Sequence, residues 1–409
     1  MPHARHLFIL LAVMLCPTLA AQEYVTLSGI VTDQHTHQPL PHVSVATDSV
    51  GTVTNEQGRF TLKVRPQTAA LSLSLIGYAS QRVPLDDHTQ ELHVQLRPSA
   101  VTMNELVVRS ADAGELVAKA ISRFPVNYSQ RDCSYYGFYR EVMQKRRQYI
   151  SISEAVVELY KTAYDHSADF DAVAIRRGRR MMNIRGADTL AVKLKGGPML
   201  PIVADVVKNS ELLFYPDDLG HYTYTLTGTE MLGNRPHFVV RMSPDGRQPY
   251  ALFYATLYID QQSLAIARAD LHLDMRHRLH ATEAMLVHKP AGLRFTPLEL
   301  TMNIYYRTEG GVTHLNYVRN ELRFKCDWHR RLFASPFTVV SEFVVTNIQP
   351  HARPIRGRES FRQRDNLYDR VEYFGDPDFW GADNIIEPTE ALNRAVERLR
   401  RSVERTLGE

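Results

Sequence analysis

LSGIVTD, from Leu27 to Asp33, is the first of five strand-like runs separated by turn-forming residues. The other four are QPLPHVSV at Gln38–Val45, GTVTNEQGRFTLKV at Gly51–Val64, LSLSLIGY at Leu71–Tyr78 and LHVQL at Leu92–Leu96. Glycine, proline, asparagine and aspartate punctuate these runs, which is typical of short β-strands. The stretch therefore predicts a small sandwich of seven strands.

The third run contains a turn whose residue types indicate its geometry. Gly58 takes a positive φ without strain, after which Phe60, Leu62 and Val64 alternate onto one face. In this order the runs closely resemble the carboxypeptidase regulatory-like domain, a transthyretin-like sandwich known beside zinc carboxypeptidases and at the start of TonB-dependent receptors. The resemblance implies a fold for residues 22–98 but no reaction, because sandwich domains serve many unrelated functions.

The first 21 residues have the pattern of a secretory signal. Arg5 precedes an apolar run from Leu7 to Leu15, and the small residues Ala20 and Ala21 offer a cleavage site. The apolar run is too short to span a bilayer as a helix. We therefore expect cleavage near Ala21 and export to the periplasm, with the outer membrane as a candidate site of peripheral association.

Composition sets limits on the rest of the chain. With 409 residues, of which 44% are hydrophobic, we expect two or three domains. The formal net charge of +3 gives no case for binding nucleic acid. Two cysteines follow the signal, Cys133 and Cys326. They are either a disulfide that closes a loop of about 190 residues or two buried thiols, and the sequence leaves both open.

Residues 99–130 are expected to form a linker with a short helix. The helix is predicted for Ala113–Phe124 from an apolar stripe that ends before Pro125. MNELVV, at Met103–Val108, resembles the TonB box of TonB-dependent receptors, with an aliphatic linker strand as the alternative. A receptor barrel of about 22 strands needs more residues than remain after this point.

Residues 131–350 are expected to form one large, curved antiparallel sheet. Most runs alternate at period two and are joined by tight turns, which predicts a sequential meander. Pro201 opens an apolar stretch that interrupts the pattern and that we interpret as a helix. Its apolar stripe includes Ile202, Val203, Val206 and Val207. The predicted fold is thus mainly β, a sandwich followed by a sheet wrapped on a helix.

Two segments of the sheet carry a second resemblance. YTLTGTEMLGNRPHFVVRMSP at Tyr224–Pro244 and YATLYIDQQSLAIARADL at Tyr254–Leu271 are similar to the paired hairpins of periplasmic lipoprotein carriers, which are open half-barrels. The tail at Phe361–Pro388 resembles an uncharacterised Bacteroidota envelope family that joins a regulatory-like sandwich to such a sheet. Neither resemblance implies a mechanism.

Residues 351–409 are expected to form an extended tail and a C-terminal helix. The helix, predicted for Pro388–Leu407, has an apolar stripe that includes Leu392, Val396 and Leu399, and arginines on its other faces. Packing on the sheet or on a partner is favoured over a membrane surface, because glutamates interrupt the basic face.

No pattern of catalytic or metal-binding residues is found. The one H-x-x-E, at His280–Glu283, falls in a predicted strand, where residues three apart point to opposite faces and cannot share an ion. A nucleophile elbow, a phosphate-binding glycine loop and an H-E-x-x-H helix are all absent from the sequence. We expect no cofactor and no enzymatic activity.

Two groups of residues are candidates for a ligand or partner surface. One is the apolar stripe of Ile202, Val203, Val206 and Val207, and the other is the basic cluster RRGRR, which comprises Arg176, Arg177, Arg179 and Arg180. The cluster is interpreted either as a contact for anionic headgroups or as solvated hairpin tips.

The sequence favours an exported, non-enzymatic envelope protein. Its curved sheet is expected to hold a lipid, a lipoprotein or a peptide, and its sandwich to act as an accessory module. A protein–protein scaffold or outer-membrane biogenesis factor is the alternative, and a hydrolase with dispersed residues is a third class.

Overall fold

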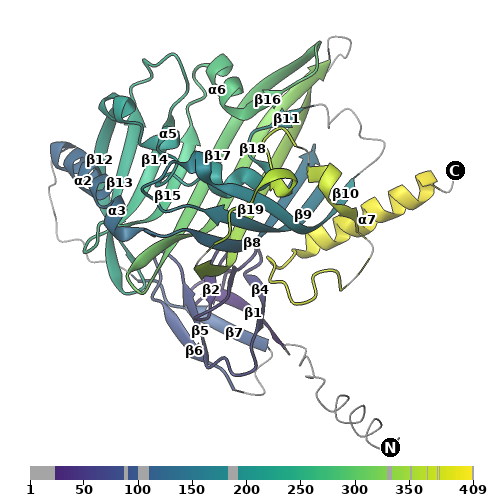
Figure 1. Cartoon of the computed structure of the whole chain (residues 1–409), viewed down its shortest axis with the longest axis horizontal. Coiled ribbons are helices and arrows are strands. Elements are labelled where there is room, and N and C mark those ends of the chain that lie inside the picture. Colours follow the sequence, from purple (N-terminus) through teal and green to yellow (C-terminus); the bar gives the residue numbers. More distant parts are fainter. Residues whose placement is uncertain are drawn as a thin grey trace, which may run out of the picture.

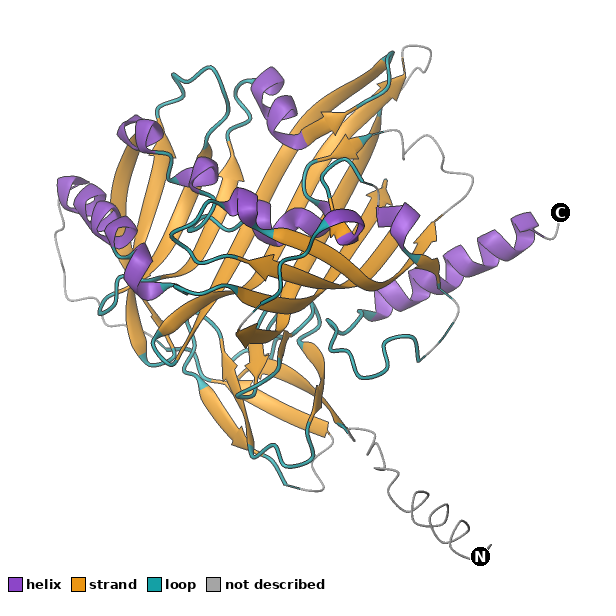
Figure 2. Ribbon diagram, viewed as in Figure 1, coloured by secondary structure: helices purple, strands orange, loops and turns teal. Residues whose placement is uncertain are grey.

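The computed structural model describes the chain from residue 24 to residue 407 with short internal gaps. The described ranges are residues 24–86, 91–99, 110–182, 192–328, 334–350, 352–365, 367–374, 376 and 378–407. The predicted signal, at 1–21, and the MNELVV segment, at 103–108, lie outside them. The protein is mainly β, with a small sandwich, a large curved sheet and a C-terminal helix (Figure 2).

The sandwich has the seven strands that the sequence predicts. One sheet has the order β4-β1-β7, with β1 at Val25–Asp33, β4 at Arg59–Val64 and β7 at Glu91–Leu96. The other has the order β3-β2-β5-β6, at Gly51–Val53, Ser44–Ala46, Ala70–Ser74 and Gln81–Pro84. Leu27, Phe60, Leu62, Leu71 and Leu73 form a core between the two sheets. The apolar side chains of each alternating strand thus face inward, and the side chains between them face outward.

The large sheet has the order β12-β13-β14-β15-β17-β18-β19-β8-β9-β10-β20, with β21 paired to β10 (Figure 1). Its strands are β8 (Cys133–Lys145), β9 (Gln148–Lys161), β10 (Ala172–Met182), β12 (Tyr222–Leu232), β13 (Arg235–Pro244), β14 (Phe253–Asp260), β15 (Ile266–Leu273), β17 (Leu293–Glu309), β18 (Val312–Trp328), β19 (Ser335–Pro350), β20 (Ser360–Phe361) and β21 (Glu372–Tyr373). A short pair, β11 (Lys193–Leu194) and β16 (Leu286–His288), lies apart from it.

The prediction of a single sequential meander is wrong at one point. The chain runs as a meander from β12 to β19, but β8 pairs with β19, so the first hairpin of the sheet joins the last strand of the meander. Strand β9 is buried on both faces from Ser151 onward. Its apolar side chains therefore require cover on both sides, which residues 200–214 supply on the inner face and the tail supplies on the outer face.

The two faces of the sheet have different neighbours. The inner face carries Tyr135, Tyr139 and Leu159 and packs on residues 200–214. The outer face carries Phe138 and Val156, and it packs on the sandwich through Val53 and on the tail through Trp380 and Ile386. Helix α2 (Ser110–Ser122), where a helix was predicted, packs on β12, and the four-residue α3 (Phe124–Asn127) follows it.

The single helix predicted after Pro201 is two helices of four residues each. They are α4 (Leu200–Val203) and α5 (Ser210–Leu213), separated by a turn in which the Asp205 carbonyl accepts hydrogen bonds from the amides of Lys208 and Asn209. The side chains of Asp205 and Lys208 are fully buried, and they form ion pairs with Lys161 and Asp171 respectively. The helix is interrupted between Val203 and Ser210, and this interval contains both charged residues.

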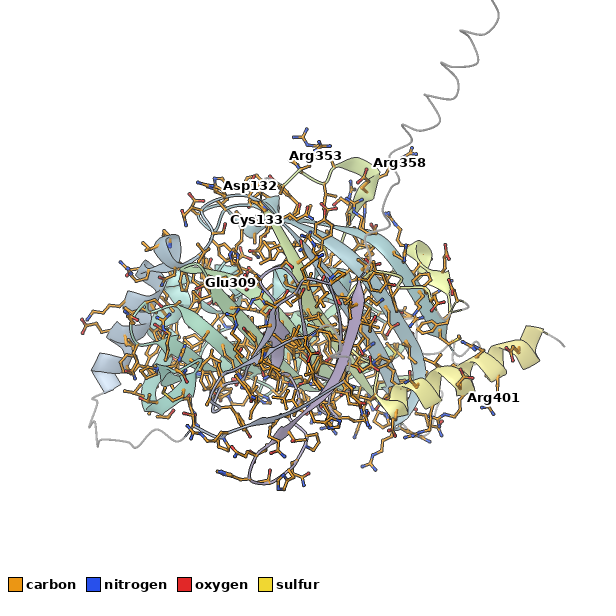
Figure 3. The ribbon with its side chains drawn as sticks, turned by 90° about the horizontal axis from the view of Figure 1, so that it is seen from below. Asp132, Cys133, Glu309, Arg353, Arg358 and Arg401 are labelled. Carbon is orange, nitrogen blue, oxygen red and sulfur yellow. The ribbon has the colours of Figure 1, made fainter. Side chains whose placement is uncertain are left out.

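A disulfide between Cys133 and Cys326 is excluded by the register of the sheet. Cys133 lies opposite Pro350 and Cys326 opposite Ser335, at the two ends of the 16-residue strand β19 (Cys133 is labelled in Figure 3). At about 3.3 Å per residue these ends are about 50 Å apart, whereas a disulfide needs Cα atoms within about 7 Å. Both cysteines, which the structure describes, are buried free thiols.

The tail ties the sandwich to the sheet. Asn384 exchanges hydrogen bonds with the backbone of Lys63 in β4, and the Thr52 hydroxyl donates to the Ile385 carbonyl. On the sheet side, Arg140 donates to the Ile386 carbonyl. Helix α7 (Glu390–Leu407) then packs Leu392, Ala395 and Leu399 against Ile152 and Met181 of the outer face, as predicted for its apolar stripe.

In the described part of the chain, no helix combines the length and apolarity needed to cross a membrane.

Candidate functional site

A network of four charged side chains lies at the centre of the inner face. Lys161 ends strand β9, Asp171 precedes β10, and Asp205 and Lys208 come from the turn between α4 and α5. Lys161 Nζ is 2.6 Å from Asp205 Oδ2, and Lys208 Nζ is 2.8 Å from Asp171 Oδ1. All four side chains are at most 1% exposed.

Tyrosine hydroxyls complete the network around Asp205. Tyr164 donates to Asp205 Oδ2 at 2.9 Å and Tyr306 to Oδ1 at 2.7 Å. Burial by itself raises the pKa of Asp205, but the Lys161 ammonium and the hydrogen bonds outweigh it and lower the pKa below its usual value. Burial raises the pKa of both tyrosines well above 10. The network is fully buried and joins residues 200–214 to Lys161 at the end of β9 and to Asp171 before β10.

A cavity of about 540 Å³ opens at the far end of the inner face, beside β10. We call it the inner-face cavity. Apolar side chains from β8, β10, β11 and the tail form much of its wall: Met143, Met182, Val192, Leu194, Phe361 and Leu367. Four basic side chains also line it: Arg180, Lys193, His288 and Arg364.

One acidic side chain, Glu141, faces this basic set. It accepts hydrogen bonds from Tyr139 Oη at 2.8 Å and Ser341 Oγ at 3.3 Å. Burial nevertheless raises the pKa of Glu141, and burial also lowers the pKa of Lys193 despite the attraction of Glu141. The cavity thus combines an apolar wall with an excess of basic groups, which suits a ligand that has an apolar chain and an anionic group.

Comparison with known families identifies the sandwich. Residues 27–108 match the family model of the CarboxypepD_reg-like domain. The match confirms the resemblance of the strand runs from Leu27 onward, and we call the sandwich the regulatory-like domain. No curated protein sequence matches the chain.

Three solved structures are similar to larger parts of the chain. A putative outer membrane lipoprotein-sorting protein domain from Vibrio parahaemolyticus is 9% identical, with 60% of this chain and 94% of that chain covered and a TM-score of 0.26. A LolA superfamily protein from Nitrosomonas europaea is 10% identical, with 59% and 94% covered and a TM-score of 0.22. A putative membrane-associated protein of unknown function from Bacteroides fragilis is 10% identical, with 80% and 98% covered and a TM-score of 0.16. With scores this low, none indicates what this chain does.

The apolar stripe predicted as a binding surface lies in the core. Ile202, Val206 and Val207 are at most 7% exposed and pack in the main hydrophobic cluster, and Val203 is half-buried. None of the four lines the inner-face cavity. The space between residues 200–207 and the sheet is therefore filled by side chains, because the buried network and the apolar stripe occupy it together.

The basic cluster is divided between the two faces of β10. A β-bulge between Ile175 and Arg177 places Arg177 opposite Val156 and Arg179 opposite Glu154, on the outer face. Arg180, the next residue, is on the inner face and lines the cavity. The interpretation of the cluster as hairpin tips is wrong, since all four arginines belong to a paired strand.

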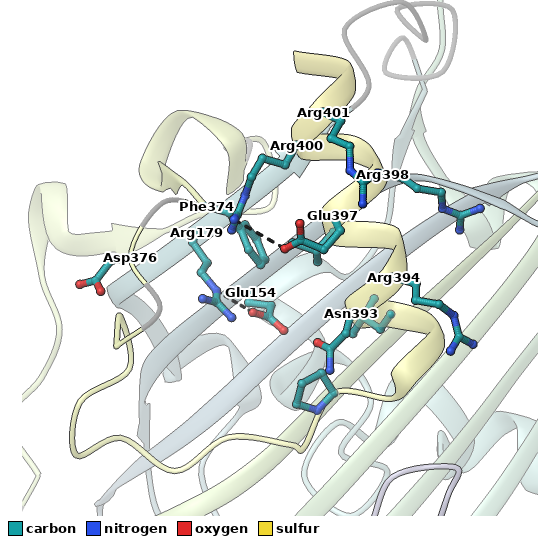
Figure 4. A pocket seen from close by; sticks show the side chains of 13 residues that line it. Glu154, Arg179, Phe374, Asp376, Asn393, Arg394, Glu397, Arg398, Arg400 and Arg401 are labelled. Carbon is teal, nitrogen blue, oxygen red and sulfur yellow. Dashed lines mark hydrogen bonds and ion pairs between the residues drawn. The ribbon is translucent and has the colours of Figure 1, made fainter. Parts of the chain in front are cut away.

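The outer arginines contact the chain's own tail. Arg179 Nε is 2.9 Å from Glu154 Oε2, and its guanidinium stacks 4.1 Å from the Phe374 ring centroid. Arg177 Nη1 donates to the Phe379 carbonyl at 2.6 Å. A second pocket, of about 750 Å³, lies between these residues and α7, whose Arg400 pairs with Glu397 (Figure 4).

The H-x-x-E segment is a helix and not a strand. Helix α6 spans Arg278–Met285, so His280 and Glu283 are on neighbouring turns and the argument from opposite strand faces is wrong. Within the described ranges, no group of three or more histidine, cysteine, aspartate or glutamate residues is placed to hold a metal ion.

Sequence reasoning missed the buried network and the polar side of the cavity. A signal for the network was present, because Asp205 interrupts the apolar run PIVADVV, Lys208 directly follows it, and Lys161 ends the strand β9. Charged residues inside apolar runs are rarely buried unless they are paired. No local signal joins Glu141, Lys193 and Arg364, which come from three distant segments.

Acidification is expected to destabilise the protein through His314. Its Nδ1 is 2.8 Å from the Tyr135 hydroxyl, and burial, with Arg307 and Lys161 nearby, lowers its pKa from 6.5 to about 4. The unfolded chain binds the proton more readily, so stability is lost as the pH falls from about 6.5 toward 4. Linkage gives a loss of about 2 kcal/mol between pH 7.5 and pH 5.

Urea unfolding at the two pH values measures this loss. His314→Asn keeps an acceptor for Tyr135 and removes the titrating group, so its drop in stability on acidification should be smaller by about 2 kcal/mol. His93→Asn, at a side chain that is 73% exposed, is the control and should behave as the unmodified chain. An equal drop in the His314 variant contradicts the assignment.

Proposed function

We propose that this protein is a non-enzymatic binding protein of the cell envelope that holds an amphipathic ligand in the inner-face cavity. The ligand is a lipid or the acyl chain of a lipoprotein. The observation that supports this proposal is the presence of an apolar wall and several basic side chains in one cavity of about 540 Å³. Export to the periplasm, expected from residues 1–21, is part of the proposal.

Each half of the cavity has a distinct task. An acyl chain placed against Met143, Met182 and Leu194 gains about 0.8 kcal/mol for each methylene removed from water. Arg180 and Arg364 are suited to an anionic headgroup, because guanidinium groups form strong charge-assisted hydrogen bonds with phosphate and carboxylate. An uncharged, purely polar ligand gains neither contribution.

Filling the cavity is expected to weaken lipid binding. Leu194→Trp enlarges a half-buried side chain of the cavity wall and should reduce the lipid that co-purifies with the full chain, measured by mass spectrometry of an organic extract, by about tenfold, which corresponds to about 1.4 kcal/mol.

Leu298→Trp is the matched control, because Leu298 is 41% exposed and outside the cavity. It should retain lipid at the level of the unmodified chain. Equal amounts of lipid in the two variants, or no acyl compound on the unmodified protein, contradict the proposal. Thermal unfolding of both variants establishes that they fold.

A further inference from the structure

A separate cleft of about 510 Å³ lies between the regulatory-like domain and the large sheet. We call it the interdomain cleft. The regulatory-like domain contributes the hydroxyls of Ser44, Ser72 and Ser74, and the sheet contributes Arg235 from β13 and Arg307 from β17. Its lining shares no residue with that of the inner-face cavity.

Arg307 presents an unused donor to this cleft. Its Nη2 is 3.1 Å from Glu309 Oε1 (Glu309 is labelled in Figure 3). Its Nη1 is buried and has no hydrogen-bond acceptor among the residues that the structure describes. Burial lowers the pKa of Arg307 although Glu309 acts against it. A buried charged donor without an acceptor is unfavourable, so an acceptor that enters the cleft and bonds to it removes this cost.

Arg235 presents a second unused donor. Its Nη2 donates to Asp260 Oδ1 at 2.6 Å, and its Nε is buried with no acceptor within the described ranges. Asp260 cannot supply one, because its Oδ1 also accepts from the backbone amides of Gln262 and Ser263, and its Oδ2 faces His237 at 3.6 Å. Two guanidinium nitrogens of the cleft thus have no acceptor, although the carboxylates of Asp260, Glu309 and Asp48 also line it.

The backbone of the regulatory-like domain makes room for Arg307. A Cβ atom on Gly51 of β3 would lie 3.2 Å from Arg307 Nη1, closer than most such contacts. Glycine at this position therefore lets the guanidinium lie against the domain. Serine hydroxyls from β2 and β5 line the same cleft, where they can donate to or accept from a hydroxylated ligand.

We infer that the interdomain cleft binds a sugar-sized molecule that carries a carboxylate or a phosphate group, with Arg307 as its main anionic contact. The volume suits a ligand of this size. Guanidinium groups match the planar or tetrahedral arrangement of the oxygens in both anions. The site uses residues from both domains, so its ligand also stabilises their association.

The test uses calorimetric titration of the full chain with galacturonate, glucose 6-phosphate, inorganic phosphate and glucose. One of the two anionic sugars should bind with a Kd of about 1 mM or tighter, and glucose should bind at least tenfold more weakly. Galacturonate and glucose 6-phosphate distinguish the carboxylate from the phosphate. Inorganic phosphate shows whether the anion alone suffices.

Matched variants separate the cleft from general charge effects. Arg307→Gln and Arg235→Gln should each weaken binding of the anionic sugar by about tenfold or more, which corresponds to about 1.4 kcal/mol. Arg323→Gln, on the same sheet at a 55% exposed arginine outside the cleft, should bind as the unmodified chain. The inference is overturned if glucose binds as tightly as the anionic sugars or if neither anionic sugar binds. It is also overturned if all three variants bind alike.

Discussion

Asp205→Asn is expected to lower the free energy of unfolding by about 3–5 kcal/mol, because it leaves the buried Lys161 ammonium with only the more distant Asp171 carboxylate, at 3.7 Å. Lys161 Nζ is 2.6 Å from Asp205 Oδ2, and both side chains are at most 1% exposed. The asparagine amide keeps the shape of the site but removes the charge that offsets the burial of Lys161. Urea unfolding followed by tryptophan fluorescence measures the change.

Two further variants show whether charge is the cause. Asp217→Asn, at an exposed aspartate, should change stability by less than about 0.5 kcal/mol. The double variant Asp205→Asn with Lys161→Met removes both charges and should recover part of the loss, since an apolar pair avoids an uncompensated buried ion. A loss below about 1 kcal/mol for Asp205→Asn contradicts the structural role of the network.

Glu154→Gln is expected to destabilise the protein by a similar amount, about 3–5 kcal/mol, and to loosen the tail. Glu154 Oε1 is 2.7 Å from Arg140 Nη2, and Oε2 is 2.9 Å from Arg179 Nε. Burial by itself raises the pKa of Glu154, but the two guanidinium groups lower it below its usual value. Loss of this charge leaves two mutually repelling guanidiniums beneath the tail.

The second readout is local and distinguishes this variant from Asp205→Asn. Arg140 also donates to the Ile386 carbonyl, and Arg179 stacks on Phe374, so hydrogen exchange should increase in residues 378–399 before global unfolding. Glu299→Gln, in a surface pair with Arg323, is the control and should leave the exchange of the tail unchanged. Unchanged exchange in the Glu154 variant contradicts the proposed link between this ion-pair group and the tail.

The regulatory-like domain could be predicted from local sequence, because its information is local. Gly58 has a φ of +70°, as its turn requires, and Leu62 and Leu71 face the core as their alternation predicts. The apolar stripe of α7 was equally visible, since a period near 3.6 residues indicates which side of a helix is buried. A local apolar pattern of this kind predicts burial correctly when only one face of the helix or strand is buried in the tertiary structure.

Predictions failed where long-range contacts overrule local pattern. The run after Pro201 has a helical stripe, but the helix ends at Val203, and the turn that follows contains Asp205 and Lys208, which pair with Lys161 and Asp171. The segment at 281–288 alternates as a strand does, yet most of it is the helix α6. Helical and strand periods are difficult to distinguish in segments this short.

The sequence by itself determined the sandwich, the large antiparallel sheet and the amphipathic C-terminal helix, because each depends on the spacing of apolar residues along one segment. Only the tertiary structure decided which residues share a site. Pairing of β8 with β19, and the bulge in β10 that sets which face Arg179 and Arg180 each occupy, place residues far apart in the chain around the inner-face cavity. These contacts depend on burial and charge pairing across the whole fold. They therefore cannot be predicted from the spacing of residues within one segment.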